Sequence, residues 1–321
     1  MIIKKTINLV VEGQLDLFSR QQPEDLNYEW IYSNQPEEAD VHVIYGFVKK
    51  HEFRNKSSFK MFITIEPPEI LTYDLNVLKQ YDLVIGGEFA YLGDLPNFRA
   101  NTGILNWSVG IDHASVKPTV SKTYSEITNL EVGNRNERIS VVTSRKAMTP
   151  LQRKRLEFIE FLDKRLPLTL YGNGLNPVGD KLEGLIPHRY HLALENSSHM
   201  SFWTEKLSDP ILALARTFYS GAPNINAEFD NAVIQPINLD NFEASYRTIE
   251  KTLSANEINY ERIKAARDYI AKEKNFHKVV ENVILKTPDR ALLGSSLTSI
   301  PKHKVSLGDR TRYTLDRLKR W

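Results

Sequence analysis

The stretch that decides the fold is His188–Pro223, HRYHLALENSSHMSFWTEKLSDPILALARTFYSGAP. It begins with an apolar strand, continues through a polar loop into a helix, and ends with a second apolar strand before a glycine turn. Polar and charged side chains gather in the loop and at the helix start, between two segments predicted to be buried: Glu195, Asn196, Thr204, Glu205 and Lys206. Such a gathering indicates a binding site.

The helix start in this stretch is suited to an anion. A helix N-terminus presents free backbone N–H groups and the positive end of the helix dipole, which together favour phosphate. Lys206 lies in the first turn, where a cation is unfavourable for the helix itself. A bound anion would offset that disadvantage. The alternative is a helix start with a structural Glu–Lys pair.

The order and spacing of short motifs in this stretch are specific. They are Arg189-Tyr190, Leu194-Glu195-Asn196, Thr204-Glu205-Lys206, and Gly221 with Pro223. In this order they resemble the donor-binding signature of the α-1,3/4-fucosyltransferases, glycosyltransferase family 10. The family has a Tyr two residues before the Thr. Phe202 stands at that position, so one donor-side hydroxyl is missing and the donor sugar stays open.

The resemblance extends from Phe62 to Ile237 and is strongest in the second half. It implies an α/β fold of the GT-B class, in which two Rossmann-like domains face each other across a cleft. It also implies inverting transfer of a sugar, L-fucose from GDP-fucose, onto a hydroxyl of an oligosaccharide or glycolipid acceptor. The positions that correspond to the donor site are Arg155, Tyr171, Gly172, Glu195, Asn196, Phe202, Thr204, Glu205, Lys206 and Gly221. The alternatives are a different nucleotide-sugar donor, or a catalytically silent protein that binds a nucleotide or a glycan.

Size and composition limit the classes of protein. The chain has 321 residues, 41% of them apolar, which is enough for two domains with their own cores. Its formal net charge is only +2, so no nucleic-acid partner is expected. There is no cysteine, which excludes disulfides and thiolate metal sites. No Asp-x-Asp pair occurs either, so we predict transfer without a metal, and with no cofactor beyond the nucleotide-sugar donor.

We predict three segments along the chain. Residues 1–137 form an N-terminal Rossmann-like domain on the acceptor side, and 138–286 form a C-terminal Rossmann-like donor domain, with the polar segment 114–138 as the linker. The rest, 287–321, is a basic tail. Its part 302–321 mixes basic and aromatic side chains, and either contacts an anionic membrane surface or forms a solvated surface helix.

The expected location follows from the absence of a targeting segment. The first apolar run of the chain is too short and too interrupted for a signal peptide or a membrane anchor. We therefore expect a cytoplasmic protein with peripheral contact to the inner face of the membrane.

Short apolar segments alternate with polar connectors in the first half, which predicts a parallel sheet covered by helices. The first strand is not followed by Gly-x-Gly-x-x-Gly, so a dinucleotide site is not expected there. The predicted strands are 6–11, 28–32, 41–45, 60–65 and 83–85.

One carboxylate of the first half follows a strand directly. Glu66 comes after the strand 60–65 and before Pro67 and Pro68, which stiffen the backbone. Open α/β sheets bind ligands at the carboxyl ends of their strands. Family 10 enzymes have a Gly-Glu-Asn turn at the corresponding place, where the Glu is the general base, so the resemblance implies that role for Glu66. Here Ile65 and Pro67 replace the Gly and the Asn. The alternative is a solvated carboxylate at a strand end.

Two further residues are candidates for the acceptor side of the site. Glu88 follows a strand that ends in a glycine turn and is predicted to face the cleft. Trp107 lies in an irregular segment, and its aromatic face suits the apolar side of a sugar ring. The alternative for Trp107 is a place in the hydrophobic core.

In the second half, Thr149 and Pro150 begin a helix, as N-cap and first helical residue. The resemblance implies that Arg155 of this helix contacts the donor pyrophosphate, since a guanidinium can donate two hydrogen bonds to phosphate. Arg153 and Arg145 are alternatives for this role. The following strand ends at Tyr171-Gly172.

Helix boundaries later in the chain leave one choice open. Pro210 either lies inside a continuous helix, where it removes a hydrogen bond, or begins a new helix capped by Asp209. Two long amphipathic patterns follow and predict helices over 241–253 and 258–284.

Overall fold

A computed structural model describes residues 5–13, 15–102, 104, 106–172, 174–287 and 297–300. These residues form two compact units. The first unit contains the described residues up to Ile104 and those from Phe276 onward, and the second contains the described residues between them. The boundary thus differs from the one predicted between residues 137 and 138, and the end of the chain returns to the first unit.

The first unit contains a six-stranded parallel sheet in the order β2-β1-β3-β4-β5-β6. Its central strands β3 and β4 are buried at every position, as expected for strands covered on both faces. The sequence predicts all of its strands except β6, to within two residues at each end. The bounds are β1 Thr6–Val11, β2 Glu29–Tyr32, β3 Val41–Tyr45, β4 Phe59–Ile63, β5 Leu83–Gly86 and β6 Phe98–Ala100.

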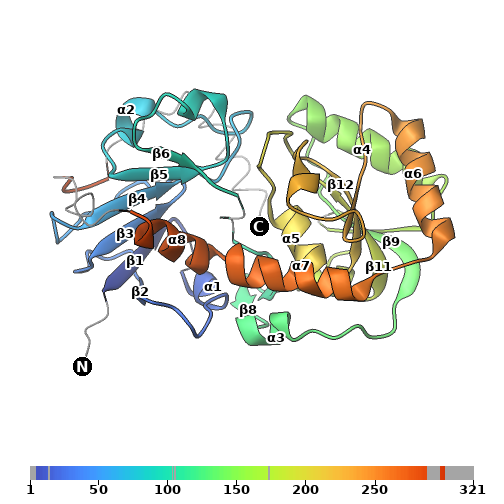
Figure 1. Cartoon of the computed structure of the whole chain (residues 1–321), viewed down its shortest axis with the longest axis horizontal. Coiled ribbons are helices and arrows are strands. Elements are labelled where there is room, and N and C mark those ends of the chain that lie inside the picture. Colours follow the sequence, from blue (N-terminus) through green and yellow to red (C-terminus); the bar gives the residue numbers. More distant parts are fainter. Residues whose placement is uncertain are drawn as a thin grey trace. The chain divides into compact units, whose positions relative to one another are not determined.

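A carboxylate fastens the last helix to the first unit. Glu281 of α8 is fully buried and accepts hydrogen bonds from the backbone N–H groups of Asn27 (2.8 Å) and Tyr28 (3.1 Å), and from the indole of Trp30 (3.1 Å). N–H donors of this kind stabilise a buried carboxylate without a cation. Figure 1 shows α8 beside the sheet of this unit. The helices are α1 Asp16–Ser19, α2 Leu75–Leu78, the 3₁₀ turn η1 Ala90–Leu92 and α8 Phe276–Leu285.

The second unit contains a five-stranded parallel sheet in the order β10-β9-β11-β12-β13. Its strands are β9 Asn136–Val142, β10 Leu168–Tyr171, β11 His188–Leu194, β12 Arg216–Ser220 and β13 Ile234–Pro236. Its longer helices are α4 Pro150–Asp163, α5 Glu205–Leu212, α6 Phe242–Ala255 and α7 Tyr260–Glu273, and its 3₁₀ turns are η2 Lys181–Gly184 and η3 Ile225–Ala227.

The faces of this sheet are covered by different helices (Figure 1). Successive side chains of a strand point to opposite faces. Leu192 and Leu194 of β11 accordingly pack in a core with Phe158 of α4 and Ile249 of α6. Ala193, between them, packs in a second core with residues of α5 and α7. The loop that follows β11 thus leaves the sheet where both cores anchor the strand.

The predicted linker 114–138 is instead a folded part of the second unit. Ile127 is fully buried in the core that α5 and α7 share. Asp180 fastens the preceding hairpin, because its carboxylate accepts from the backbone N–H of Gly110 (3.1 Å) and the hydroxyl of Ser121 (2.5 Å). The polar composition belongs to the exposed sides of short elements, β7 Ile111–Asp112, β8 Thr119–Val120 and α3 Tyr124–Thr128.

The single helix predicted over 258–284 is wrong. Two helices, α7 and α8, occupy this stretch and belong to different units. Ile263 of α7 packs in a core of the second unit. Phe276, at the start of α8, contacts the rings of Phe18 and Tyr45 in the first unit, with centroids 5.4 Å away in each case. Both helices are amphipathic, so the apolar period alone does not reveal the break.

The two Rossmann-like units confirm the predicted α/β fold class. In the part of the chain that the structure describes, no helix has the length and apolar character needed to cross a membrane. The predicted basic tail, 302–321, lies outside the described residues. Its contact with a membrane surface stays a prediction.

Candidate functional site

The polar loop after β11 is fastened to the first turn of α5. Thr204 is the N-cap of α5, and its hydroxyl accepts from the Lys206 backbone N–H at 3.3 Å. Glu195 follows β11 and is 2% exposed. Its carboxylate oxygens accept from the backbone N–H (2.8 Å) and the hydroxyl (2.7 Å) of Thr204. Glu195 therefore fixes the start of the helix.

The charges at this helix start form a compact ion-pair group. Lys206 Nζ lies 2.8 Å from Glu205 Oε1 and 4.0 Å from Glu195 Oε2. Burial works against its charge, but these two carboxylates raise the pKa of Lys206. Burial also works against the charge of Glu205, yet Lys206 and Lys181 lower the pKa of Glu205 to about 2. The pair is therefore ionised at neutral pH. Glu205 offsets the unfavourable position of Lys206 in the first turn, as expected from the alternative of a helix start with a structural Glu–Lys pair.

Arg155 connects the helix α4 with the same loop. Its side chain is 4% exposed, and burial lowers its pKa. The guanidinium donates to Thr143 Oγ1 (3.0 Å), to the Leu194 carbonyl (3.3 Å) and to Asn196 Oδ1. Its Nε atom is buried and has no hydrogen-bond partner among the described residues. Arg155 thus ties the ends of β9 and β11 together beside the charged helix start.

A further ion pair in this group was not predicted. Asp209 of α5 is fully buried, and Lys181 Nζ lies 2.7 Å from its Oδ2. Burial raises the pKa of Asp209, and Lys181 opposes that shift. Asp209 Oδ1 also accepts from the Ser108 backbone N–H at 3.2 Å. A Lys and an Asp that lie 28 residues apart carry no local sequence signal for such a pair.

Pro210 lies inside one helix and does not begin a new one. α5 runs continuously from Glu205 to Leu212 with Pro210 inside it. Asp209 therefore does not cap a new helix, and its side chain serves the pair with Lys181.

Two glycines allow other groups to approach the backbone closely at this edge of the sheet. Gly172 follows β10 with φ +124°, and a Cβ there would lie 1.9 Å from the Thr143 carbonyl oxygen. At Gly221, after β12, a Cβ would lie 2.5 Å from Glu195 Cγ. Both predicted positions therefore need glycine for close approach.

Two more residues predicted for the donor site are Tyr171 and Phe202. The Tyr171 hydroxyl lies 2.9 Å from His188 Nε2, and the two rings meet edge to face. Phe202 is 5% exposed. Direct contact of either side chain with a ligand stays a prediction.

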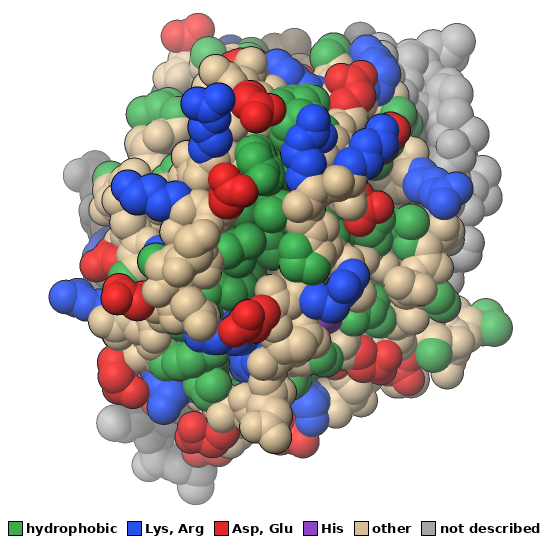
Figure 2. Space-filling view, turned by 90° about the vertical axis from the view of Figure 1, so that its right-hand side faces the viewer, with side chains coloured by type: hydrophobic (Ala, Val, Ile, Leu, Met, Phe, Trp, Pro, Cys, Tyr) green, Lys and Arg blue, Asp and Glu red, His purple; other side chains and the backbone are tan. Residues whose placement is uncertain are grey.

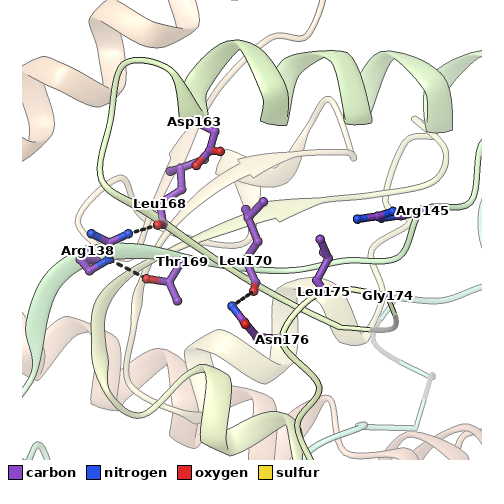
Figure 3. A pocket seen from close by; sticks show the side chains of 9 residues that line it. All are labelled: Arg138, Arg145, Asp163, Leu168, Thr169, Leu170, Gly174, Leu175 and Asn176. Carbon is purple, nitrogen blue, oxygen red and sulfur yellow. Dashed lines mark hydrogen bonds between the residues drawn. The ribbon is translucent and has the colours of Figure 1, made fainter.

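The alternatives to Arg155 lie in other surroundings. Arg145 lines a cavity of about 340 Å³ beside the edge strand β10 (Figure 3). In this cavity Arg138 donates to the Leu168 carbonyl, and Asn176 donates to the Leu170 carbonyl at 2.9 Å, so side chains cover the acceptors of the strand edge. Arg153 donates to the Ala147 carbonyl at 3.1 Å. Of the three arginines, Arg155 is the one that contacts the loop after β11 in the part of the chain described.

The first unit holds Glu66 at the end of β4, half-buried, on a closely packed backbone. Thr64 donates its backbone N–H to Ile85 at 2.8 Å, and Ile65 donates to the Tyr73 hydroxyl at 3.3 Å. Glycines stand on both sides of this segment. A Cβ at Gly46 would lie 2.4 Å from Ile65 Cδ1, and one at Gly86 would lie 1.7 Å from Thr64 Oγ1. The backbone that carries Glu66 is therefore firmly positioned.

The two acceptor-side candidates differ in exposure. Glu88 is exposed after β5. Trp107 is 1% exposed and packs in the core with α5 and α7, where its ring stacks on Tyr124 with centroids 6.3 Å apart. Its faces are occupied by the core, so the alternative of a core tryptophan describes it and sugar stacking does not.

On one face of the molecule, charges of both signs are mixed. Figure 2 shows Lys and Arg side chains interspersed with Asp and Glu around a hydrophobic middle on one face. That face lacks the continuous basic surface that binds a phosphate backbone. Among the described residues, no three His, Asp or Glu side chains are grouped so that they could hold a metal ion. Independence of metals and of nucleic acids stays a prediction.

Fold and site together define a protein of two Rossmann-like units, with a group of paired charges at the carboxyl edge of the second sheet. No protein-family model and no curated protein matches the chain. Solved structures similar to it include α1,3-fucosyltransferase with GDP (15% identity, 85% of this chain, 92% of that chain, TM-score 0.46). The same enzyme with GDP-fucose is 16% identical over 84% of this chain and 90% of that chain, with TM-score 0.46. Trehalose-6-phosphate synthase is 12% identical over 76% of this chain and 71% of that chain, with TM-score 0.45.

Proposed function

We propose that the chain is an inverting glycosyltransferase that takes its sugar from a nucleoside diphosphate, with GDP-L-fucose as the first donor to test. The observation that carries this proposal is the convergence of the signature residues. Residues separated by up to 41 positions, such as Arg155 and Asn196, are in contact around the start of α5. GDP-fucose itself is suggested by the motif resemblance, and Phe202 is the residue that leaves another nucleotide sugar as an alternative.

The proposed chemistry divides between the two ends of the reaction. The acceptor hydroxyl oxygen forms a bond to the anomeric carbon while the bond from that carbon to the diphosphate oxygen breaks. Glu66 takes the proton of the hydroxyl as general base. The developing charge on the leaving diphosphate is stabilised by Arg155, Lys206 and the backbone N–H groups at the helix start. Glu205, ionised beside Lys206, suits a hydroxyl of the ribose or the sugar, because a carboxylate only accepts hydrogen bonds.

The test is turnover of GDP-fucose by the wild-type chain beside Glu66→Gln. Loss of a general base lowers kcat by about 10²–10⁴-fold, while the dissociation constant of GDP stays unchanged. Glu69→Gln is the matched control, since Glu69 is an exposed carboxylate three residues further along the same loop. Its turnover should equal that of the wild type.

The other outcomes identify the rival functions. Binding of GDP without release of fucose supports the silent binding protein. Release of sugar from a different nucleotide donor would show that the chain is a glycosyltransferase whose donor is not GDP-fucose. Equal turnover by Glu66→Gln and the wild type would remove Glu66 from the mechanism.

A further inference from the structure

The loop before α5 contains a non-glycine residue in a left-handed conformation. Ser201 has φ +56°, which is unfavourable for an L-residue other than Gly, Asn or Asp. The neighbouring Met200 is 49% exposed, so apolar packing of that side chain does not hold the turn. Strained residues of this kind persist only where their surroundings fix them.

One side chain from a distant part of the sequence fixes Ser201. Asn224, after β12, accepts from the Ser201 backbone N–H at 2.8 Å and donates to the Ser201 hydroxyl oxygen at 2.9 Å. Asn224 is also the N-cap residue of η3, yet its side chain makes no capping hydrogen bond there. The carboxamide is therefore committed to the loop and not to its own helix.

Two other contacts fasten the same loop. The Ser198 hydroxyl donates to the Gly221 carbonyl at 2.9 Å. The Trp203 indole donates to Glu228 at 2.7 Å, and Glu228 is itself paired with Lys274 at 2.8 Å. Trp203 immediately precedes the N-cap of α5, so these contacts determine where the helix begins.

We propose that Asn224 is a positioning residue of the site: by holding Ser201 in its left-handed turn, it sets the place of Thr204, Glu205 and Lys206 before a ligand arrives. A site arranged in advance binds more tightly, because less ordering is required on association. The ligand part of this inference rests on the proposed function, and the class of ligand is a nucleoside diphosphate.

The test uses three variants and two measurements. Asn224→Ala removes both hydrogen bonds. Asn224→Asp retains them, because a carboxylate accepts from the Ser201 N–H and the Ser201 hydroxyl can turn to donate. Asn97→Ala is the matched control, since Asn97 is a half-buried amide of the first unit that donates to the carbonyls of Leu78 and Tyr81. The measurements are amide hydrogen exchange of the ligand-free chain over residues 201–207, and the dissociation constant of GDP.

In Asn224→Ala, exchange over 201–207 should be about tenfold faster and GDP should bind about tenfold more weakly. Asn224→Asp should restore both values to near those of the wild type, and Asn97→Ala should change neither. Unchanged exchange in Asn224→Ala overturns the proposal. Faster exchange with unchanged GDP affinity overturns the role in binding. If the wild type binds no GDP, the proposed ligand is wrong, and the exchange rates alone decide whether Asn224 sets the helix start.

Discussion

The carboxyl edges of the two sheets are built in different ways. At the edge of the second unit, buried and partly buried carboxylates are paired with cations, as in Glu205 with Lys206 and Asp209 with Lys181. At the edge of the first unit, Glu66 stands on a segment held by backbone hydrogen bonds and by the close approach of Gly46 and Gly86. A multiply charged ligand requires charges arranged beforehand, whereas transfer of one proton requires only a carboxylate with a fixed direction.

The largest effect on stability should come from removing a charge at the second edge. Lys206→Met removes the cation paired most closely with the carboxylates of Glu205 and Glu195, so the free energy of unfolding should fall by about 3 kcal/mol. If Lys206 contacts the diphosphate as proposed, the affinity for GDP should fall by about 100-fold. Denaturant unfolding and calorimetric titration with GDP measure the two quantities.

The control for Lys206→Met is a pair at the surface. Lys154 is paired with Asp240, whose side chain is 81% exposed. Lys154→Met should therefore change the free energy of unfolding by less than about 1 kcal/mol and leave GDP binding intact. Equal effects of the two variants would mean that the second edge has no special charge arrangement.

The next prediction compares a buried histidine of each unit at neutral pH. His42 of β3 is fully buried, and neither of its ring nitrogens has a hydrogen-bond partner among the described residues. His191 of β11 is 2% exposed, and its Nδ1 lies 2.8 Å from Ser140 Oγ. His42→Leu should therefore be neutral or stabilising at pH 7. His191→Leu should cost about 1 kcal/mol, because the Ser140 hydroxyl loses its shorter hydrogen bond and retains only the one to the Tyr190 carbonyl at 3.3 Å. Denaturant unfolding at pH 7 measures both.

Protonation of the His42 ring should also destabilise the fold at acidic pH. Burial, with His51 and Lys60 nearby, lowers the pKa of His42 to about 4. In the unfolded chain, His42 is protonated below its ordinary pKa of about 6.5, whereas in the folded chain it is protonated only below about 4. The contribution of neutral His42 to the free energy of unfolding is therefore fully present above about pH 6.5. It is lost as the pH falls from about 6.5 to about 4. The loss from His42 amounts to about 3 kcal/mol, and His42→Leu should abolish that part. An unaltered acid profile in His42→Leu would assign the loss to other groups.

The sequence predicts the sheets better than it predicts the charge partners. Apolar runs indicated the strands because a parallel strand is buried on both faces, and the spacing of Glu195, Thr204 and Lys206 indicated the site. The pair of Lys181 with Asp209 and the clamp by Asn224 join segments that meet only in the fold. Composition also misled, since polar residues of 114–138 form exposed sides of folded elements and not a linker.

The last comparison concerns the direction of Glu66 at the first edge. Tyr73 and Tyr81 both contact the ring of Phe62, with centroids 5.3 and 5.1 Å away. The Tyr73 hydroxyl accepts from the Ile65 backbone N–H at 3.3 Å, while the Tyr81 hydroxyl is buried without a hydrogen-bond partner among the described residues. Tyr73→Phe therefore removes a bond next to Glu66, and Tyr81→Phe removes none.

We expect Tyr73→Phe to lower the free energy of unfolding by about 1 kcal/mol. If Glu66 is the general base as proposed, Tyr73→Phe should also lower kcat severalfold with an unchanged donor KM, because the carboxylate is then less firmly directed. Tyr81→Phe should leave both quantities near those of the wild type. Since the two rings pack on the same Phe62, the difference between the variants separates the interactions of the Tyr73 hydroxyl from ring packing. A larger effect of Tyr81→Phe would show that packing, and not the backbone hydrogen bond, directs the carboxylate at this edge.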